Sequence, residues 1–368
     1  MGYEVDFFNV GDKSQPGAAI ALRYGDLSGD RSQQTVMVID GGTLETGDRL
    51  VEHIKKFYGT EEVDFVVLTH MHDDHASGLR PVLEQLQVNK LVMHRPWANN
   101  RAVLTFMQDG RATPGSVKER LVRSLSTAKE LEDLATEKGI PIVEPFADVH
   151  AVATEPICVL GPDKAYFAEC MAAALEDRQA PAEGGLLTAY LAAMGEGIRM
   201  LVDKWLMEAL ADPGENDVTP TNNASVILLI QTDERQLLFT GDAGVPALTR
   251  ALDKAVEIGV PVVRPQLLQI PHHGSKRNLG PTLLDRLCGT KSLAEVGDGD
   301  LDRTAIACCA KESAPKHPHA LVTNALRRRK YKGIAANTSI IHHRYNAPDR
   351  EGWYPVNAIP FISEIEDD

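Results

Sequence analysis

Short apolar runs alternate with stretches of helical spacing along the first quarter of the chain. The predicted strands are 5–10, 18–24, 34–39, 63–68 and 89–94, and the predicted helices are 44–58 and 78–86. The strand at 34–39 runs into Asp40-Gly41-Gly42, where the glycine pair indicates a tight turn. This alternation of strand and helix indicates a layered α/β fold.

Two blocks of helical pattern lie further along the chain. Apolar residues recur at spacings of three and four within 97–139 and again within 163–212. Packing against a sheet explains such faces, and a lid or a partner-binding surface is the alternative. The apolar positions are Val117, Leu121, Leu125, Ala128, Leu131 and Leu134 in the first block, and Leu191, Met194, Ile198, Leu201, Trp205 and Leu210 in the second.

Strand patterns return between and after these blocks, and the chain has no internal repeat. The predicted strands are 142–152, 157–160, 224–231, 236–240, 267–270, 305–310 and 338–342. We therefore expect a single domain over 1–368, with helical insertions at about 97–139 and 163–215.

The composition restricts the class of protein. Hydrophobic residues make up 43% of the chain, yet no apolar run reaches the ~20 residues that a membrane-spanning helix needs. The N-terminus carries Glu4 and Asp6 where a signal peptide needs basic residues. The five cysteines form no CxxC pair, which argues against a disulfide framework. We expect a cytoplasmic protein without membrane contact.

The net charge of −14 argues against a protein that coats nucleic acid nonspecifically, because that affinity comes from lysine and arginine. It does not exclude a nuclease, since bound metal ions supply local positive charge. One basic run exists at Arg327-Arg328-Arg329-Lys330-Tyr331-Lys332. Either a solvated helix end or a phosphate-binding patch would explain it.

The densest group of polar side chains directly follows the predicted strand at 63–68. It reads His70-Met71-His72-Asp73-Asp74-His75 and is called the 70–75 loop below. Three imidazoles and a carboxylate on so short a loop would repel one another if the imidazoles were protonated. A divalent cation removes that conflict, because neutral imidazole and carboxylate are its preferred ligands. The 70–75 loop therefore predicts a metal site.

Two later strands also end in residues of this chemistry. The strand at 236–240 is followed by Gly241-Asp242, and the strand at 267–270 by Pro271-His272-His273-Gly274-Ser275. Open α/β sheets place their sites at the carboxyl ends of the strands. The sequence thus predicts that histidines and carboxylates from three strands meet at one edge.

These motifs resemble those of metallo-β-lactamase-fold hydrolases. The pattern is closest to the hydrolase domain of ComEC-type DNA-uptake proteins and their free-standing relatives. The residues that carry the resemblance are Phe8-Asn9-Val10-Gly11-Asp12, Val38-Ile39-Asp40-Gly41-Gly42, the 70–75 loop with Gly78, Asn222 to Leu228, Phe239-Thr240-Gly241-Asp242, Pro271 to Ser275, and His317-Pro318. The resemblance implies a four-layer αβ/βα sandwich with two metal ions at one edge.

The resemblance also implies a set of ligands. His70 and His72 would hold one metal ion, Asp74 and His75 the other, and Asp242 would bridge them. His273 would complete the second site. His272 is the alternative for that role, and whichever of the two does not bind metal would meet the substrate.

One departure concerns the first metal ion. Many members of the family supply a further histidine some twenty residues before the bridging aspartate, where this chain has Asn222-Asn223. An amide oxygen is a weaker ligand than imidazole, which favours a labile site or manganese in place of the expected zinc. His94, at the end of its own strand, is a possible substitute ligand.

The function implied is a metal-dependent hydrolase that uses a metal-bridging hydroxide. A phosphodiesterase or nuclease acting on DNA or RNA is the leading interpretation, with Asp74, His272 and His317 as catalytic candidates. A carboxylate that does not itself bind metal, Asp73 or Asp40, could orient a ligating imidazole through a hydrogen bond. One alternative is a hydrolase of carboxyl esters, lactones, thioesters or phosphorylcholine esters. The other is an effector subunit gated by a protein partner that binds the helical insertions.

Overall fold

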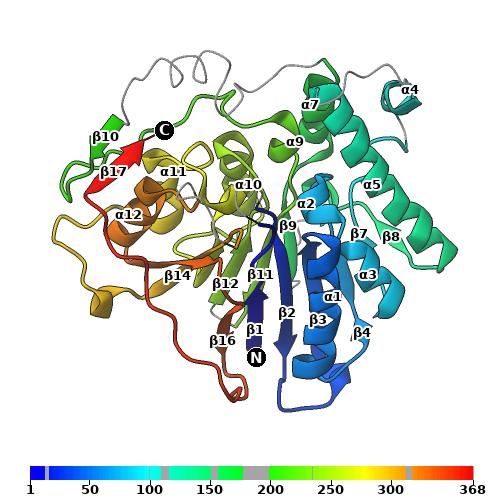
Figure 1. The fold of residues 1–368 in the computed structure, drawn as a ribbon, viewed down its shortest axis with the longest axis horizontal. Helices are drawn as coiled ribbons and strands as arrows, with labels where there is room; N and C mark the ends of the chain where they lie inside the picture. The colour runs from blue at the N-terminus through cyan, green and yellow to red at the C-terminus, as the bar shows by residue number, and fades with distance from the viewer. Residues whose placement is uncertain are drawn as a thin grey trace.

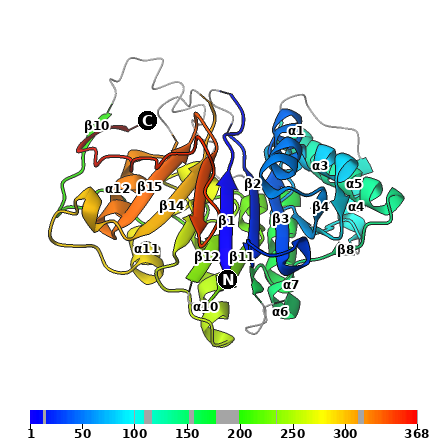
Figure 2. The same ribbon diagram turned by 90° about the horizontal axis from the view of Figure 1, so that it is seen from below.

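The computed structural model describes residues 1–12, 16–98, 100–108, 116–150, 156–176, 199–233, 235–311 and 317–367. Within these ranges two large sheets face each other, and helices cover the outer side of each (Figure 1). The α/β fold and its four-layer αβ/βα arrangement are as predicted. Figure 2 shows α1, α3 and α5 on one flank, and α10, α11 and α12 on the other.

The first sheet has seven strands in the order β16-β1-β2-β3-β5-β7-β8. The strands β16, β1, β2 and β3 pair antiparallel, whereas β3, β5, β7 and β8 run parallel. Its strands are β1 (Gly2–Phe7), β2 (Ala19–Gly25), β3 (Gln34–Gly41), β5 (Phe65–Val67), β7 (Leu91–Val92), β8 (Ile142–Val143) and β16 (Ile341–Tyr345). The chain therefore returns near its C-terminal end to complete the sheet that its N-terminus began.

The second sheet has six strands in the order β15-β14-β13-β12-β11-β9. Parallel pairing runs from β12 through β13 and β14 to β15, so these four strands end at the same edge. Its strands are β9 (Ile157–Gly161), β11 (Ile227–Thr232), β12 (Arg235–Phe239), β13 (Leu267–Gln269), β14 (Arg303–Cys308) and β15 (Tyr331–Ala336). Two further pairs of strands, β4 (Glu62–Val63) with β6 (Gln87–Val88) and β10 (Arg199–Val202) with β17 (Glu364–Asp367), lie outside both large sheets.

Strand alternation builds the core between the sheets. In β2 and β3, Ile20, Leu22, Met37 and Ile39 join one buried cluster, which includes Phe239 of the facing sheet. The intervening residues of the same strands, such as Ala21 and Val38, belong to the cluster under the helices. Successive side chains of a strand point to opposite faces, so fully apolar strands are required when both faces are covered.

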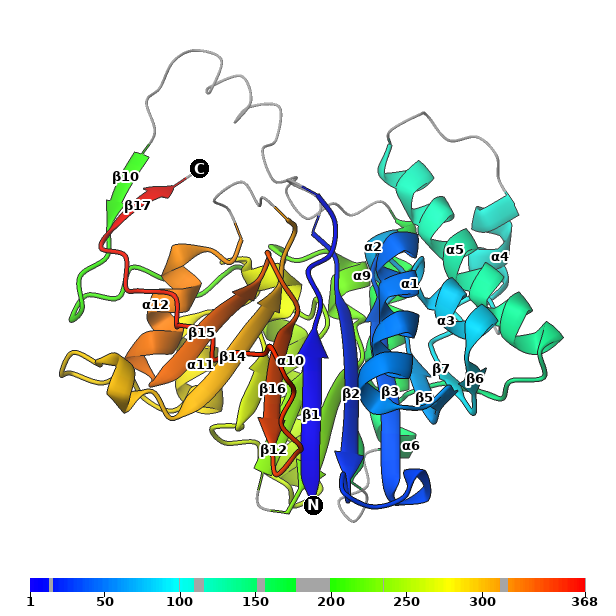
Figure 3. The same cartoon turned by 60° about the horizontal axis from the view of Figure 1, so that its bottom comes forward.

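The helices form the two outer layers (Figure 3). Their first turns are set by hydroxyl or carboxylate caps: Thr43 caps α1, Ser116 caps α5 and Asp163 caps α7, each accepting a hydrogen bond from a backbone N–H. The helices are α1 (Leu44–His53), continued by a π-helical turn (Ile54–Tyr58), α2 (Asp73–Ala76), α3 (Leu79–Gln85), α4 (Arg101–Gln108), α5 (Val117–Glu137), α6 (Ala147–His150), α7 (Lys164–Leu175), α9 (Pro220–Asn223), α10 (Val245–Glu257), α11 (Pro281–Cys288) and α12 (Ala320–Arg328).

The predicted second helical block is confirmed over Lys164–Leu175, which form α7, and is wrong in its C-terminal part. Helix α7 ends at Leu175, and Leu201 lies in strand β10, while Trp205 and Leu210 lie outside any helix. Leu191, Met194 and Ile198 are outside the described residues. The apolar spacing misled because Trp205 contacts residues distant in sequence: its ring lies against Phe361, and its indole N–H donates a hydrogen bond to the Ser292 carbonyl.

Two other expectations need correction. The strand predicted at 142–152 is only Ile142–Val143, and Ala147–His150 form a short helix instead. Strand β8 joins the first sheet, whereas the following strand β9 joins the second. Strand β15, which starts inside the basic run, was not predicted.

The basic run is neither a solvated helix end nor a phosphate-binding patch. Arg328 is fully buried and makes a two-pronged ion pair with Asp203. Arg329 is also buried and pairs with Glu208 and Asp285. These guanidinium groups therefore fasten the 203–208 segment to α12, and they are not available to an external phosphate.

A second buried charge cluster joins the two ends of the chain. Asp6 of β1 accepts hydrogen bonds from Tyr58, from His342 of β16 and from Arg350, at 2.7–3.1 Å. His53 Nε2 lies 3.0 Å from the same carboxylate. Burial by itself raises the pKa of Asp6, but the hydrogen bonds from His342 and His53 and the charge of Arg350 outweigh it and hold the pKa well below the usual value.

Candidate metal centre

Three strands deliver the predicted residues to one place. The 70–75 loop follows β5, Asp242 follows β12, and His272 and His273 follow β13. Three groups of possible metal ligands result, and within each group the ligand atoms lie within 4.8 Å of one another. These groups are His70, His75 and Asp242; Asp74, His75 and His273; and Asp242, His272 and His273.

Asp242 lies at the centre of this cluster. Its Oδ2 atom is 3.8 Å from His70 Nε2, 3.7 Å from His272 Nε2 and 3.9 Å from His273 Nε2. Its Oδ1 atom is 3.5 Å from His75 Nε2. The carboxylate is buried, and its own backbone N–H donates to Ser225 Oγ. One carboxylate therefore faces four imidazoles, which suits a ligand shared between two cations.

His72 is outside these groups but lies beside them. Its Nδ1 atom is 3.1 Å from His70 Nε2, and its Nε2 atom is 2.9 Å from the hydroxyl of Thr221 in α9. The Thr221 hydroxyl in turn is 3.1 Å from that of Thr219. His70 Nε2 and His72 Nδ1 thus face each other, and the pairing of these two histidines on the first metal ion stays a prediction.

In two histidines, the Nδ1 atom that points away from Asp242 lies next to an oxygen that can only accept a hydrogen bond. His273 Nδ1 lies 3.1 Å from the Cys308 carbonyl, and His75 Nδ1 lies 2.7 Å from the carboxylate of Asp40. Each Nδ1 therefore carries the proton, and each Nε2 is left as a lone pair. His75 Nε2 is buried, and no group in the described ranges hydrogen-bonds to it.

Two further histidines are fixed in the same tautomer by a longer chain of bonds. The Thr69 hydroxyl donates to Asp40, so it must accept from His70 Nδ1 at 3.1 Å. The Asn278 amide donates to the carbonyls of Asp242 and Ala243, so its oxygen faces His272 Nδ1 at 3.0 Å. In both rings the proton is therefore on Nδ1, and the unprotonated Nε2 points to Asp242. Such outer partners orient metal ligands in proteins.

The protonation states agree with metal binding. Burial lowers the pKa of His70, His72 and His273, the last to about 4, so these rings are neutral at neutral pH. His75 differs: burial would lower its pKa, but the carboxylates of Asp242 and Asp40 outweigh burial and raise it well above 6.5. This position therefore attracts positive charge, and a cation bound at His75 Nε2 would take the place of the second proton. The donor set fits two divalent cations.

The backbone around the cluster is locally strained. Asp40, His272 and His273 have φ angles of 56°, 46° and 58°, in the left-handed region that non-glycine residues rarely adopt. Gly274 also has a positive φ, and a Cβ there would lie 2.4 Å from Pro318. The sharp turn after β13 therefore brings two adjacent histidines to the cluster, and glycine is required directly after them.

Three other predicted residues lie as follows. His317 precedes Pro318, which packs on Gly274, so its segment borders the cluster. Asn222 is buried, and its side-chain oxygen has no hydrogen-bond partner in the ranges that the structure describes. His94 is not in any of the ligand groups: it is buried between the rings of Phe146 and Phe167, and burial lowers its pKa to about 3. His94 as a substitute ligand is not supported.

Of the two carboxylates considered as outer partners, only Asp40 orients an imidazole. Asp73 instead hydrogen-bonds to Thr127 and pairs with Arg123, both in α5. Thr221 and Asn278 were not anticipated. Their hydroxyl and amide carry no signal in the sequence, because only the tertiary fold places them next to His72 and His272.

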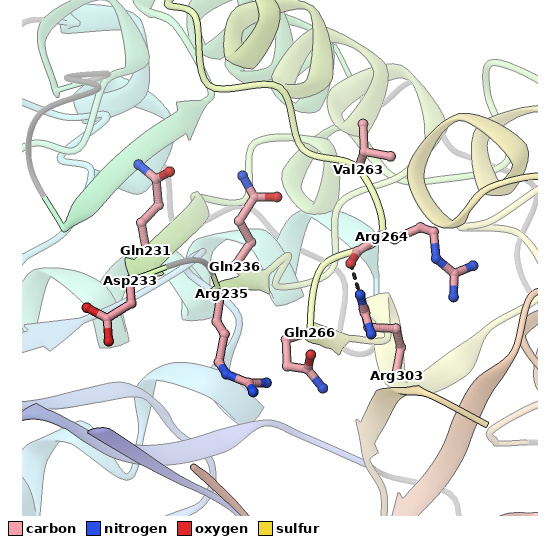
Figure 4. Close-up of a pocket in the computed structure, with 8 residues that line it drawn as sticks. All are labelled: Gln231, Asp233, Arg235, Gln236, Val263, Arg264, Gln266 and Arg303. Carbon is pink, nitrogen blue, oxygen red and sulfur yellow. Dashed lines mark hydrogen bonds between the residues drawn. The ribbon is translucent and has the colours of Figure 1, made fainter. Parts of the chain in front are cut away.

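A separate polar cavity lies at the opposite edge of the second sheet (Figure 4). It has a volume of about 240 Å³ and is lined by residues at the starts of β12, β13 and β14, including Arg235, Gln266 and Arg303. Arg264 of its wall is committed to Asp302 and to two backbone carbonyls. This cavity holds none of the predicted site residues.

Replacing Asp40 by asparagine is expected to weaken metal binding by about 10–100-fold, because an outer partner of a ligating histidine is lost. Asparagine tolerates the left-handed backbone of this position, so the turn itself should persist. The measurement is competition for metal with a chromophoric chelator. Asp64→Asn, which changes a carboxylate bound to Arg31 at a distant strand start, is the matched control and should leave the metal affinity unchanged.

Comparison with known families agrees with this geometry. Residues 31–152 match the family model described as the metallo-beta-lactamase superfamily. Over 145 residues, 39% of this chain, the sequence is 26% identical to ComE operon protein 3 of Bacillus subtilis (strain 168). That match covers 16% of the relative, so the chain corresponds to a small part of its length.

Two solved structures show weaker similarity. Igni18, a metallo hydrolase of Ignicoccus hospitalis KIN4/I, is 12% identical, with 93% of this chain and 99% of that chain covered and a TM-score of 0.37. A long form RNase Z from yeast is 10% identical, with 98% and 40% covered and a TM-score of 0.32. Both TM-scores are low, so the similarity to the metallo-beta-lactamase superfamily rests on the sequence matches. No helix in the described ranges is long and apolar enough to cross a membrane.

Proposed function

We propose that this chain, whose residues 31–152 match the metallo-beta-lactamase superfamily, is a metal-dependent phosphodiesterase with DNA or RNA as the substrate class. The observation that carries the proposal is the convergence of His70, His75, His272 and His273 on Asp242. In this proposal His70, His72 and Asp242 hold one cation, and Asp74, His75, Asp242 and His273 the other. Two bound cations would supply positive charge for the phosphoryl oxygens and lower the pKa of an attacking water.

His272 is the residue of the cluster best placed to meet a substrate. Its side chain is 32% exposed, whereas those of His70, His75 and His273 are buried. Asn278 holds the proton on His272 Nδ1, so Nε2 faces the reaction side as a base. In this role His272 would take up a proton and pass it to the leaving oxygen. His272 would then not be a metal ligand, and the other residues of the cluster would hold the two cations.

Charge next to His272 favours a phosphodiester over an uncharged ester. Lys276 and Arg277 lie a few residues after the His272-His273 pair in the sequence, and both are partly exposed. Together with two cations, they would offset the overall net charge of −14 at the point where an anionic substrate binds. The sequence similarity to ComE operon protein 3 and the resemblance to DNA-uptake proteins also favour a phosphodiester substrate.

The test is to load the purified protein with Zn²⁺ or Mn²⁺, measure bound metal, and assay bis-p-nitrophenyl phosphate, single- and double-stranded DNA, RNA and a panel of esters and lactones. Phosphodiester cleavage that chelator abolishes, and that Asp74→Ala and His75→Ala both lack, supports the proposal. Turnover of esters or lactones alone would refute it. Full metal occupancy without turnover of any substrate would also count against it.

A further inference from the structure

Asp73 turns its side chain away from the metal cluster, although Asp74 belongs to this cluster and His72 lies beside it. The Asp73 carboxylate accepts a hydrogen bond of 2.8 Å from the Thr127 hydroxyl through Oδ1. Its Oδ2 atom is 2.6 Å from Arg123 Nε. Thr127 and Arg123 are four residues apart in α5 and so lie on the same face of that helix. The carboxylate between His72 and Asp74 is therefore fixed by a different element.

Helix α5 is anchored independently of this contact. Its apolar residues Leu121, Leu125, Ala128, Leu131 and Ala135 are buried in the core. Near its C-terminal end, Glu132 accepts a hydrogen bond of 2.6 Å from the Trp97 indole, and Lys138 donates to the carbonyls of Leu83 and Glu84. A helix held at so many points can act as a fixed support for a neighbouring loop.

The 70–75 loop needs such a support because its own helix is short. Helix α2 has four residues, and its first turn rests on the N–H groups of His75 and Ala76, which donate to the His72 carbonyl. Ser77 closes the turn by donating to the Asp73 carbonyl. A single turn of helix is marginal without tertiary contacts. A tie at Asp73 thus fixes the direction in which His72 and Asp74 point.

We infer that Thr127 and Arg123 are positioning residues that set the geometry of the metal ligands through Asp73. The inference rests on the proposed metal-binding function. Helix α5 then has a part in the site as well as in packing. Thr127 carries more of the effect than Arg123, because the Arg123 side chain is 66% exposed and an ion pair in water contributes little.

The test compares Thr127→Val with Thr136→Val, which removes a hydroxyl that bonds only to the Glu132 carbonyl of the same helix. Metal affinity is measured by competition with a chelator, and ligand geometry by the absorption spectrum of the Co²⁺-loaded protein. Thr127→Val should lose about tenfold in affinity and change the spectrum. Thr136→Val should match the wild type, and Thr127→Ser should restore the wild-type values.

Asp73→Ala combined with Thr127→Val provides the second measurement. If Thr127 acts through Asp73, the double variant should bind metal no more weakly than Asp73→Ala alone. Additive losses, or a Thr127→Val protein with wild-type affinity and spectrum, would overturn the inference. A wild-type protein that binds neither Zn²⁺, Mn²⁺ nor Co²⁺ would instead refute the proposed function on which it rests.

Discussion

Asp242→Asn is expected to remove metal binding and catalysis together. The substitution keeps the size of the side chain but removes the charge that faces four imidazoles at 3.5–3.9 Å. The loss in kcat/KM for bis-p-nitrophenyl phosphate should be at least about 100-fold, the upper end of the effect that outer partners of metal ligands have. Bound metal per chain, measured by elemental analysis after dialysis, should fall in parallel.

Asp302→Asn is the matched control, because this carboxylate pairs with Arg264 beside the distant polar cavity. It should retain the wild-type metal content and rate. An Asp242→Asn protein with full metal content and a rate within about twofold of the wild type would show that the cluster is not the reaction site.

Asp6→Ala is expected to have the largest effect on stability. It removes the carboxylate that two buried imidazoles share and leaves the guanidinium of Arg350 with Glu4 as its remaining carboxylate partner. Removing one partner from a buried charge pair costs about 3–5 kcal/mol. Urea unfolding at neutral pH should show this loss as a lower midpoint. The segment around Arg350 should also become more sensitive to protease, since Arg350 ties it to β1.

The effect of Asp6 should depend on pH in a defined direction. The folded pKa of Asp6 is held well below its usual value of 3.8, so the ionised carboxylate stabilises the fold at all pH values above 3.8. As the pH falls below 3.8 towards the folded pKa, the unfolded chain takes up the proton first and this stabilisation is lost. The difference in unfolding free energy between wild type and Asp6→Ala should therefore shrink in acid.

Asp349→Ala is the control for this cluster. Asp349 pairs with Arg344 on the surface and is 93% exposed, so its removal should change stability little. A similar loss for both variants would show that general charge, and not the buried network, sets the acid sensitivity. An Asp6→Ala protein as stable as the wild type would contradict the assignment of the cluster as a structural anchor.

The strands that carry the site could be predicted because their patterns are local. Each run of apolar residues before His70, Asp242 and His272 is short and ends in polar chemistry, and the structure has a strand at each. The 142–152 segment and the 201–210 segment were mispredicted for the opposite reason. Apolar residues there contact partners distant in sequence, such as Phe361 for Trp205, and periodicity does not record such contacts.

The basic run shows the same limit for charge. Arg328 and Arg329 look exposed in the sequence because arginine is rarely buried. Their carboxylate partners, Asp203 and Glu208, lie more than a hundred residues earlier in the chain. Only the fold brings them together, and it converts an apparent phosphate patch into a structural ion-pair cluster.

The sequence alone determined the layered α/β class, the three strand ends and the residue types of a candidate metal centre, because strand periodicity and ligand chemistry depend on neighbouring residues. The tertiary structure decided what surrounds these ligands. It placed Asp40 on His75, Thr221 on His72 and Asn278 on His272, and it turned Asp73 towards α5. These contacts join residues far apart in the chain, and their geometry follows from how the two sheets and their helices pack.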